Sequence, residues 1–174
     1  MIVTPRLILR PWRETDLPLF AEQNADPETM RFLGGPMTRE QSDAYAGRAE
    51  RHRETHGFGK WAIEAPGLSS FIGCAGLKHT EIEASFAPAV EMTWRLHRRH
   101  WGQGFATEAS RAAIADGFER VGLAEIVAMA ALLNLASTRV MERLGMTRSI
   151  EFDYPGYPEG HPSCRHALFR IRPQ

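Results

Sequence analysis

The sequence lacks the features typical of a secreted, membrane-spanning or nucleic-acid-binding protein. It has two cysteines, Cys74 and Cys164, without the close spacing of a zinc site or the density of a disulfide scaffold. Its 21 basic and 21 acidic residues cancel, whereas nucleic-acid-binding domains are usually basic. No apolar run approaches the roughly 20 residues that cross a bilayer, and Arg6 and Arg10 interrupt the N-terminal run where a signal peptide would be apolar. We therefore expect a cytoplasmic protein that binds neither nucleic acid nor membrane.

The length of 174 residues favours one domain over residues 1–174, and no repeat or linker divides the chain. Apolar and polar residues alternate most clearly over 89–96, where Glu91 lies on the polar face of the predicted strand. Seven strands are predicted at 6–10, 60–65, 70–77, 89–96, 125–132, 146–154 and 165–171. Helices are predicted from Thr15–Asp16 onward, from Asp26 to Phe32, from Thr38 to His56, over 103–121 and over 134–144. This order indicates an α/β fold, a mixed sheet with helices on both faces.

A glycine-rich turn, RRHWGQGFATEA at 98–109, lies between the predicted strand 89–96 and the next helix. A helix start has unpaired N–H groups and partial positive charge, so it can bind phosphate. Gly102 and Gly104 would let the backbone approach such a ligand closely. The alternative is that the glycines only make a tight turn. The turn is neither a GxxxxGK(S/T) loop nor a GxGxxG loop, because Thr107 stands three residues after Gly104.

Residues 99–104, RHWGQG, match the pattern Gln/Arg-x-x-Gly-x-Gly/Ala of the GNAT superfamily of N-acetyltransferases. The longer stretch WGQGFATEA resembles the branch that contains the bacterial ribosomal-protein N-terminal acetyltransferases. TPRLILRPWRETD at 4–16, FIGCAGL at 71–77 and NLASTRVMERLGM at 134–146 resemble further segments of that branch, in the same order. The resemblance implies a mostly antiparallel seven-stranded GNAT sheet and acetyl-CoA as the acetyl donor, with no metal.

The resemblance also implies where acetyl-CoA binds. The glycine loop would hold the pyrophosphate, the pantetheine arm would lie where strand 89–96 splays from strand 125–132, and backbone N–H groups near Trp94 would face the thioester oxygen. Asn134 would hydrogen-bond the pantetheine arm, and Ser137 would lie near the sulfur. Each has a structural alternative, since asparagine is a good helix N-cap and serine is tolerated in a first turn. The predicted coenzyme contacts are Trp94, Leu96, Arg99, Gly102, Gln103, Gly104, Phe105, Ala106, Asn134 and Ser137.

Acetyl transfer to an amine needs a base, because an ammonium group must lose its proton before it can attack. We predict Glu91 for this role. His79, His161 and Glu159 are alternatives, and Glu91 could instead be a solvated strand residue. Many GNAT members carry a tyrosine acid seven residues after the asparagine, where this chain has Met141. Either Ser137 protonates the leaving thiolate or it leaves unprotonated, which a thiol pKa of about 8.5 permits.

The expected activity is N-acetylation of a primary amine, either a protein N-terminus or a small molecule, by direct attack in a ternary complex. Phe32, Trp61 and Tyr154 are the predicted acceptor contacts, although aromatic residues more often pack in a core or loop. Two alternatives are a non-catalytic acyl-CoA-binding module, favoured by the missing tyrosine, and a transferase for a longer acyl group. GNAT members are often homodimers, but no feature of this sequence requires one.

Overall fold

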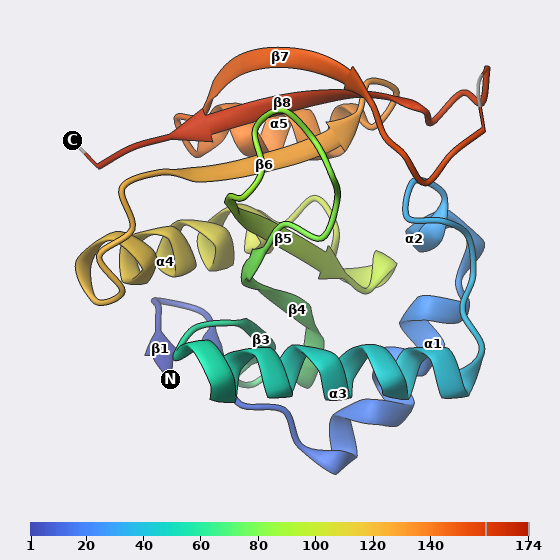
Figure 1. Ribbon diagram of the computed structural model, residues 1–174. Helices are drawn as coiled ribbons and strands as arrows, with labels where there is room; N and C mark the ends of the chain where they lie inside the picture. The colour runs from blue at the N-terminus through green and yellow to red at the C-terminus, as the bar shows by residue number, and fades with distance from the viewer. Residues whose placement is uncertain (159, 174) are drawn as a thin grey trace.

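In the computed structural model, which describes residues 1–158 and 160–173, eight strands form one mixed, mostly antiparallel sheet (Figure 1). The strands are β1 (Ile2–Val3), β2 (Ile8–Arg10), β3 (Lys60–Ala65), β4 (Ser69–His79), β5 (Val90–Leu96), β6 (Ile126–Ala131), β7 (Thr147–Asp153) and β8 (Arg165–Ile171). Their spatial order is β1-β2-β3-β4-β5-β6-β8-β7, and only the β5–β6 pair is parallel among the described strands. The prediction of seven strands missed β1, because two residues are too short for a visible alternation.

Helices cover both faces of the sheet, as the sequence predicts (Figure 1). They are α1 (Leu17–Ala25), α2 (Pro27–Met30), α3 (Arg39–His56), α4 (Phe105–Glu119) and α5 (Leu135–Arg143), with short 3-10 turns at Glu14–Asp16 and Arg98–His100. Helices α1 and α3 contribute Phe20 and Ala46 to a cluster with Phe71 of β4. Helix α4 covers the opposite face, where Ile114 joins the main core with Met92 of β5.

The helix starts show which local signals decide the structure. The side chain of Asp26 accepts the main-chain N–H of Thr29 at 3.1 Å, and Thr38 and Gln41 form the predicted capping box. Asp16 is the N-cap residue of α1, as predicted, but its side chain makes no capping hydrogen bond to that helix. Asp16 is buried and accepts two hydrogen bonds of 2.8 Å from the Arg10 guanidinium, because an arginine buried in β2 needs an anionic partner.

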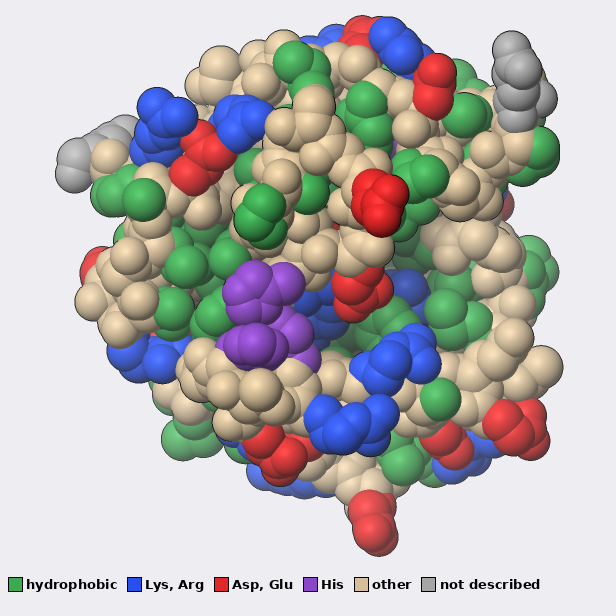
Figure 2. Space-filling model, viewed as in Figure 1, with side chains coloured by type: hydrophobic (Ala, Val, Ile, Leu, Met, Phe, Trp, Pro, Cys, Tyr) green, Lys and Arg blue, Asp and Glu red, His purple; other side chains and the backbone are tan. Residues whose placement is uncertain are grey.

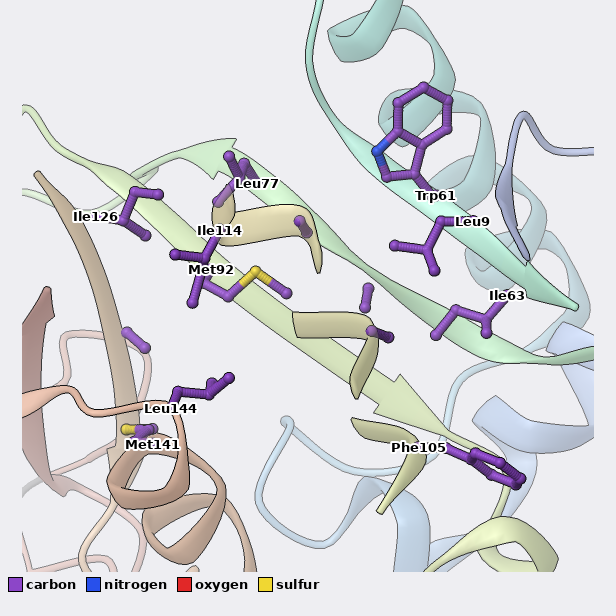
Figure 3. Close-up of a cluster of buried hydrophobic side chains, with 14 of the residues drawn as sticks. Leu9, Trp61, Ile63, Leu77, Met92, Phe105, Ile114, Ile126, Met141 and Leu144 are labelled. Carbon is purple, nitrogen blue, oxygen red and sulfur yellow. The ribbon is translucent and has the colours of Figure 1, made fainter. Parts of the chain in front are cut away.

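The main core extends from β2 to β8 between the sheet and α4 (Figure 3). Leu9, Ile63, Leu77, Met92 and Ile114 share this cluster. Trp61 and Met141 belong to it as well, with exposed fractions of 7% and 1%. No helix in the described part of the chain has both the length and the apolar character needed to cross a membrane.

Candidate active site

The candidate site begins where the sheet separates. Strands β5 and β6 run parallel, but their only recorded pairing in the described chain joins Glu91 to Val127, near the start of both strands. Beyond this point the strands diverge toward their carboxyl ends (Figure 1). Helix α4 follows β5 and helix α5 follows β6, so both helices begin at the open end. In α/β sheets, ligands bind outside the carboxyl ends of the strands at such a point.

Backbone groups of β5 face this opening. The N–H of His97 donates to Ile72 O at 3.0 Å, on the β4 side of the strand. Backbone groups alternate sides along an antiparallel strand, so the N–H groups of Trp94 and Leu96 point away from β4. They therefore face the opening toward β6, as the family resemblance implies.

The glycine loop ends at the start of α4. Gly102 and Gly104 have φ values of +74° and +81°, in the left-handed region that favours glycine. Gly104 is the N-cap of α4 and has no side chain to cap the helix. The main-chain N–H groups of residues 102–107 have no acceptor among the described residues. Six free donors at a helix start fit a pyrophosphate, which can accept several N–H hydrogen bonds.

Neighbouring side chains hold the loop in this shape. The indole N–H of Trp101 donates to Leu96 O at 2.8 Å. Arg6 of the N-terminal segment donates to Gln103 O at 3.0 Å, lies over the Phe105 ring at 4.6 Å and pairs with Glu108 at 2.7 Å. Because these contacts use backbone carbonyls and side chains, they leave the loop N–H groups free.

The other predicted coenzyme contacts contribute in different ways. Phe105 is 6% exposed and anchors the first turn of α4 in the core, so only its N–H can meet a ligand. Ala106 is half-buried. The side chains of Arg99 and Gln103 are exposed, and Gln103 Nε2 donates to Arg99 O at 3.3 Å. Arg99 also lines a shallow surface pocket with Glu22, Asp26, His97 and Arg98.

Helix α5 brings a second helix start to the opening. Asn134 is its N-cap, and Asn134 Oδ1 accepts the N–H of Ser137 at 3.2 Å. The prediction that Asn134 caps a helix is therefore correct. Its amide nitrogen has no partner in the described chain. The hydroxyl of Ser137 likewise has none and is half-buried. Met141, at the position of the family's tyrosine, is buried beside Leu144 in the core (Figure 3).

Glu91 is not a solvated strand residue. Its side chain is 12% exposed, and Lys78 Nζ of β4 lies 3.6 Å from its carboxylate. Burial raises the pKa of Glu91 above its ordinary value, although the charges of Lys78 and Lys60 oppose this shift. A buried carboxylate with a raised pKa has the properties of a general base.

A pocket next to Glu91 is lined by residues that the sequence analysis did not select. They are Tyr45, Arg48, Ala49, His52, Lys60, Leu77, Lys78 and Glu81. Lys60 is buried, and its ammonium group donates to the Tyr45 hydroxyl. Figure 2 shows this hollowed face, where histidine, basic and acidic side chains gather around the depression. The lining comes from α3, β3, β4 and the loop after β4, so no short motif could have revealed it.

The predicted acceptor contacts are not all near this pocket. Trp61 packs in the core with Leu9 and lines neither described pocket (Figure 3). Phe32 is half-buried after α2, under the Arg31 guanidinium at 5.2 Å. Tyr154 is half-buried, and its pKa is raised by burial and then by the Glu91 carboxylate. In the β7–β8 loop the Tyr154 ring stacks on that of His166, with 4.8 Å between the ring centres.

The alternative bases fall in three different environments. His79 lies at the end of β4 against His52, with 3.1 Å between His79 Nδ1 and His52 Nε2. His161 is exposed, and its Nδ1 accepts the N–H of Ser163 at 3.0 Å. Glu159 lies outside the described residues. Of the described candidates, Glu91 alone lies on β5, at the residue where its pairing with β6 stops.

Comparison with known proteins agrees with this geometry. The model of the Acetyltransferase (GNAT) domain matches residues 6–147. This chain belongs to the GNAT acetyltransferase family. It is 31% identical to the FsC-acetyl coenzyme A-N(2)-transacetylase of Aspergillus fumigatus over 180 residues. The aligned region covers 96% of this chain and 75% of that protein.

Solved structures share the GNAT fold. An acetyltransferase from Agrobacterium tumefaciens has 27% identity and a TM-score of 0.81, with 99% of this chain and 94% of that chain covered. A ribosomal L7/L12 alpha-N-protein acetyltransferase, solved with coenzyme A, has 18% identity and a TM-score of 0.78, with 98% and 96% covered. At this lower identity, the second likeness concerns the fold alone.

Proposed function

We propose that this protein transfers the acetyl group of acetyl-CoA to a primary amine by direct attack in a ternary complex. The observation that carries the proposal is the convergence of free backbone N–H groups on one opening. Three features lie at this opening: the free N–H groups of residues 102–107 at the start of α4, the unpaired edge of β5, and the start of α5. Membership of the GNAT family and the 31% identical transacetylase support this activity.

Acetyl-CoA supplies a thioester, and the chain's own groups bind and orient it. The N–H groups of residues 102–107 would receive the pyrophosphate, with the exposed Arg99 adding positive charge. The free amide nitrogen of Asn134 would donate to the pantetheine arm. The N–H groups of Trp94 and Leu96 would stabilise the oxyanion that forms on the carbonyl oxygen.

Glu91 would prepare the acceptor. Its carboxylate takes a proton from the acceptor ammonium group, and the free amine then forms a C–N bond to the carbonyl carbon. The C–S bond breaks, the sulfur leaves as a thiolate, and the new amide nitrogen gives up its remaining extra proton to the thiolate or to solvent. Ser137 lies on α5 about one helical turn before Met141, the position of the family's tyrosine, and it would donate a hydrogen bond to the sulfur. Met141 has no proton to offer.

The pocket beside Glu91 favours one class of amine. Arg48, Lys60 and Lys78 bring three cationic groups to its lining, against one carboxylate from Glu81. Lys60 is buried, where an anionic partner stabilises a charge most strongly. A polycation such as a polyamine would be repelled. We therefore propose an acceptor with an anionic group near its amine, such as an amino acid or the N-terminal residues of an acidic peptide.

Calorimetric titration of acetyl-CoA into the wild-type protein and Gly104→Glu tests the coenzyme site. A carboxylate about 4 Å from a phosphate charge adds roughly 4 kcal/mol of repulsion at an effective dielectric constant of about 20. We therefore expect affinity to fall at least about 100-fold. Gly122→Glu is the matched control, since Gly122 has φ +78° and open space but lies beyond the far end of α4. Equal affinities for all three proteins would refute the proposed pyrophosphate site.

Turnover tests the rest of the proposal through thiol release with a panel of anionic and cationic amines. Acetylation of anionic amines, with polyamines poor, is the expected result. Preference for polyamines would overturn the proposed acceptor class while leaving the transferase in place. Tight acetyl-CoA binding without turnover of any amine would favour the non-catalytic module. Faster turnover with longer acyl-CoA donors would favour a transferase for a longer acyl group.

A further inference from the structure

Three histidines gather at one edge of the acceptor pocket and have no role in the proposed acetyl transfer. His52 and His56 lie on the last turns of α3, and His79 ends β4. One ring nitrogen from each lies within 4.8 Å of the others. The purple side chains beside the depression in Figure 2 show this grouping.

The spacing of these nitrogens suits a metal ion. Residues four apart on a helix lie on one face, and two such histidines form half of a common zinc motif. His52 Nε2 and His79 Nδ1 are 3.1 Å apart. Two nitrogens bound tetrahedrally to zinc at about 2.0–2.1 Å would be separated by about 3.3–3.4 Å. A small movement of the exposed His56 ring would complete the set.

The surroundings of His52 orient it as a ligand. His52 Nδ1 lies 3.1 Å from Phe58 O, so this nitrogen carries the proton and donates it to the carbonyl. The lone pair is then left on Nε2, which accepts the main-chain N–H of His79 at 3.2 Å in this structure and would turn to the metal when it binds. Metal-binding histidines usually make this second hydrogen bond, which fixes the ring and its tautomer.

An apolar side chain lies against the cluster. The Phe58 ring is 6% exposed, and its centre lies 5.3, 6.1 and 5.2 Å from those of His52, His56 and His79. Phe58 belongs to the main core, so the cluster lies against apolar packing on this side.

We propose that His52, His56 and His79 bind a divalent transition metal of the zinc type through three imidazoles, with a fourth position open. Bound metal would join the end of α3 to the end of β4. His52 also lines the acceptor pocket, so the metal would fix one wall of it. This site is independent of acetyl transfer and stands even if the proposed acceptor is wrong.

Zinc titration against a chromophoric chelator tests the site in full-length protein first stripped with EDTA. We expect one zinc per chain, and at least tenfold weaker binding for His56→Gln and for His79→Gln. His161→Gln is the control, since His161 is an exposed histidine outside the cluster. Cobalt in place of zinc should give the visible absorption of a tetrahedral site, which both cluster variants should lose.

His56→Gln and His79→Gln should fold like the wild type, because both histidines are exposed. Their variants should unfold at the wild-type Tm without metal, and zinc should raise the Tm of the wild type and of His161→Gln only. The proposal fails if stripped wild type binds no zinc, or if His56→Gln and His79→Gln bind it as tightly as wild type. The three histidines would then form only a hydrogen-bonded cluster, in which the main-chain N–H of His79 donates to His52 Nε2 at 3.2 Å.

Discussion

The two sides of the candidate site are built from different parts of the chain. The proposed coenzyme side uses mainly backbone N–H groups from a short glycine loop and two helix starts. The proposed acceptor side uses side chains, with Tyr45, Lys60 and Lys78 coming from three separate elements. A backbone site depends on conformation, which a few glycines can fix, and it suits a ligand common to a whole family. A side-chain site can change with each substitution, so it can adapt to different acceptors.

Glu91→Gln should separate the two sides most sharply. We expect kcat to fall about 10²- to 10⁴-fold, the usual contribution of a general base, while acetyl-CoA affinity stays at the wild-type value. The pKa of Glu91 is raised by burial, and a base works only when deprotonated. Wild-type kcat/KM should therefore rise with pH through this raised pKa, and the variant should lose that rise. Steady-state kinetics across pH, with calorimetry of acetyl-CoA, measure both effects.

Glu81→Gln is the matched control for this charge change. Glu81 lies 3.4 Å from the same Lys78 ammonium group, but its side chain is 74% exposed. It should alter the KM for the acceptor and leave the pH profile unchanged. If Glu91→Gln keeps near-wild-type kcat, or if Glu81→Gln also loses the pH dependence, Glu91 is not the base.

The same contrast explains what the sequence could predict. Gly102 and Gly104 are two residues apart, and glycine by itself indicates that the backbone there can take positive φ values. Asn134 likewise precedes a clear helical segment, so both helix starts were predicted correctly. Met141 was correctly excluded as an acid, because no fold can give methionine a proton to donate.

Long-range contacts account for what the sequence did not predict. The pocket around Lys60 and the three-histidine cluster need α3 to pack beside β4, which no local pattern specifies. The spacing of His52 and His56 was a visible signal for two of the three histidines. Two side chains have other roles than those predicted. Trp61, a predicted acceptor contact, packs in the core, and Asp16, a predicted helix cap, pairs with Arg10.

Asn134 has a structural and a coenzyme role, which two substitutions can separate. Asn134→Ser keeps a good N-cap but removes the amide nitrogen, so stability should hold while acetyl-CoA affinity falls about 2- to 12-fold, the value of one hydrogen bond. Asn134→Ala should show the same loss of affinity and also lower the free energy of unfolding by about 1 kcal/mol. Urea unfolding and calorimetry measure the two quantities. Unchanged affinity in Asn134→Ser would leave Asn134 as a helix cap alone.

Ser137→Ala should have the smallest effect and decides how the sulfur leaves. The Ser137 hydroxyl has no partner among the described residues and lies at the start of α5, so it is free to face the opening. A thiol with a pKa of about 8.5 leaves readily without a proton, and the serine then contributes one hydrogen bond, at most about tenfold in kcat. Rapid-quench measurement of the chemical step would test this. A loss of 100-fold or more would make Ser137 the general acid, and a side chain on the acetyl-donor side would then take part in the chemical step and not only in binding.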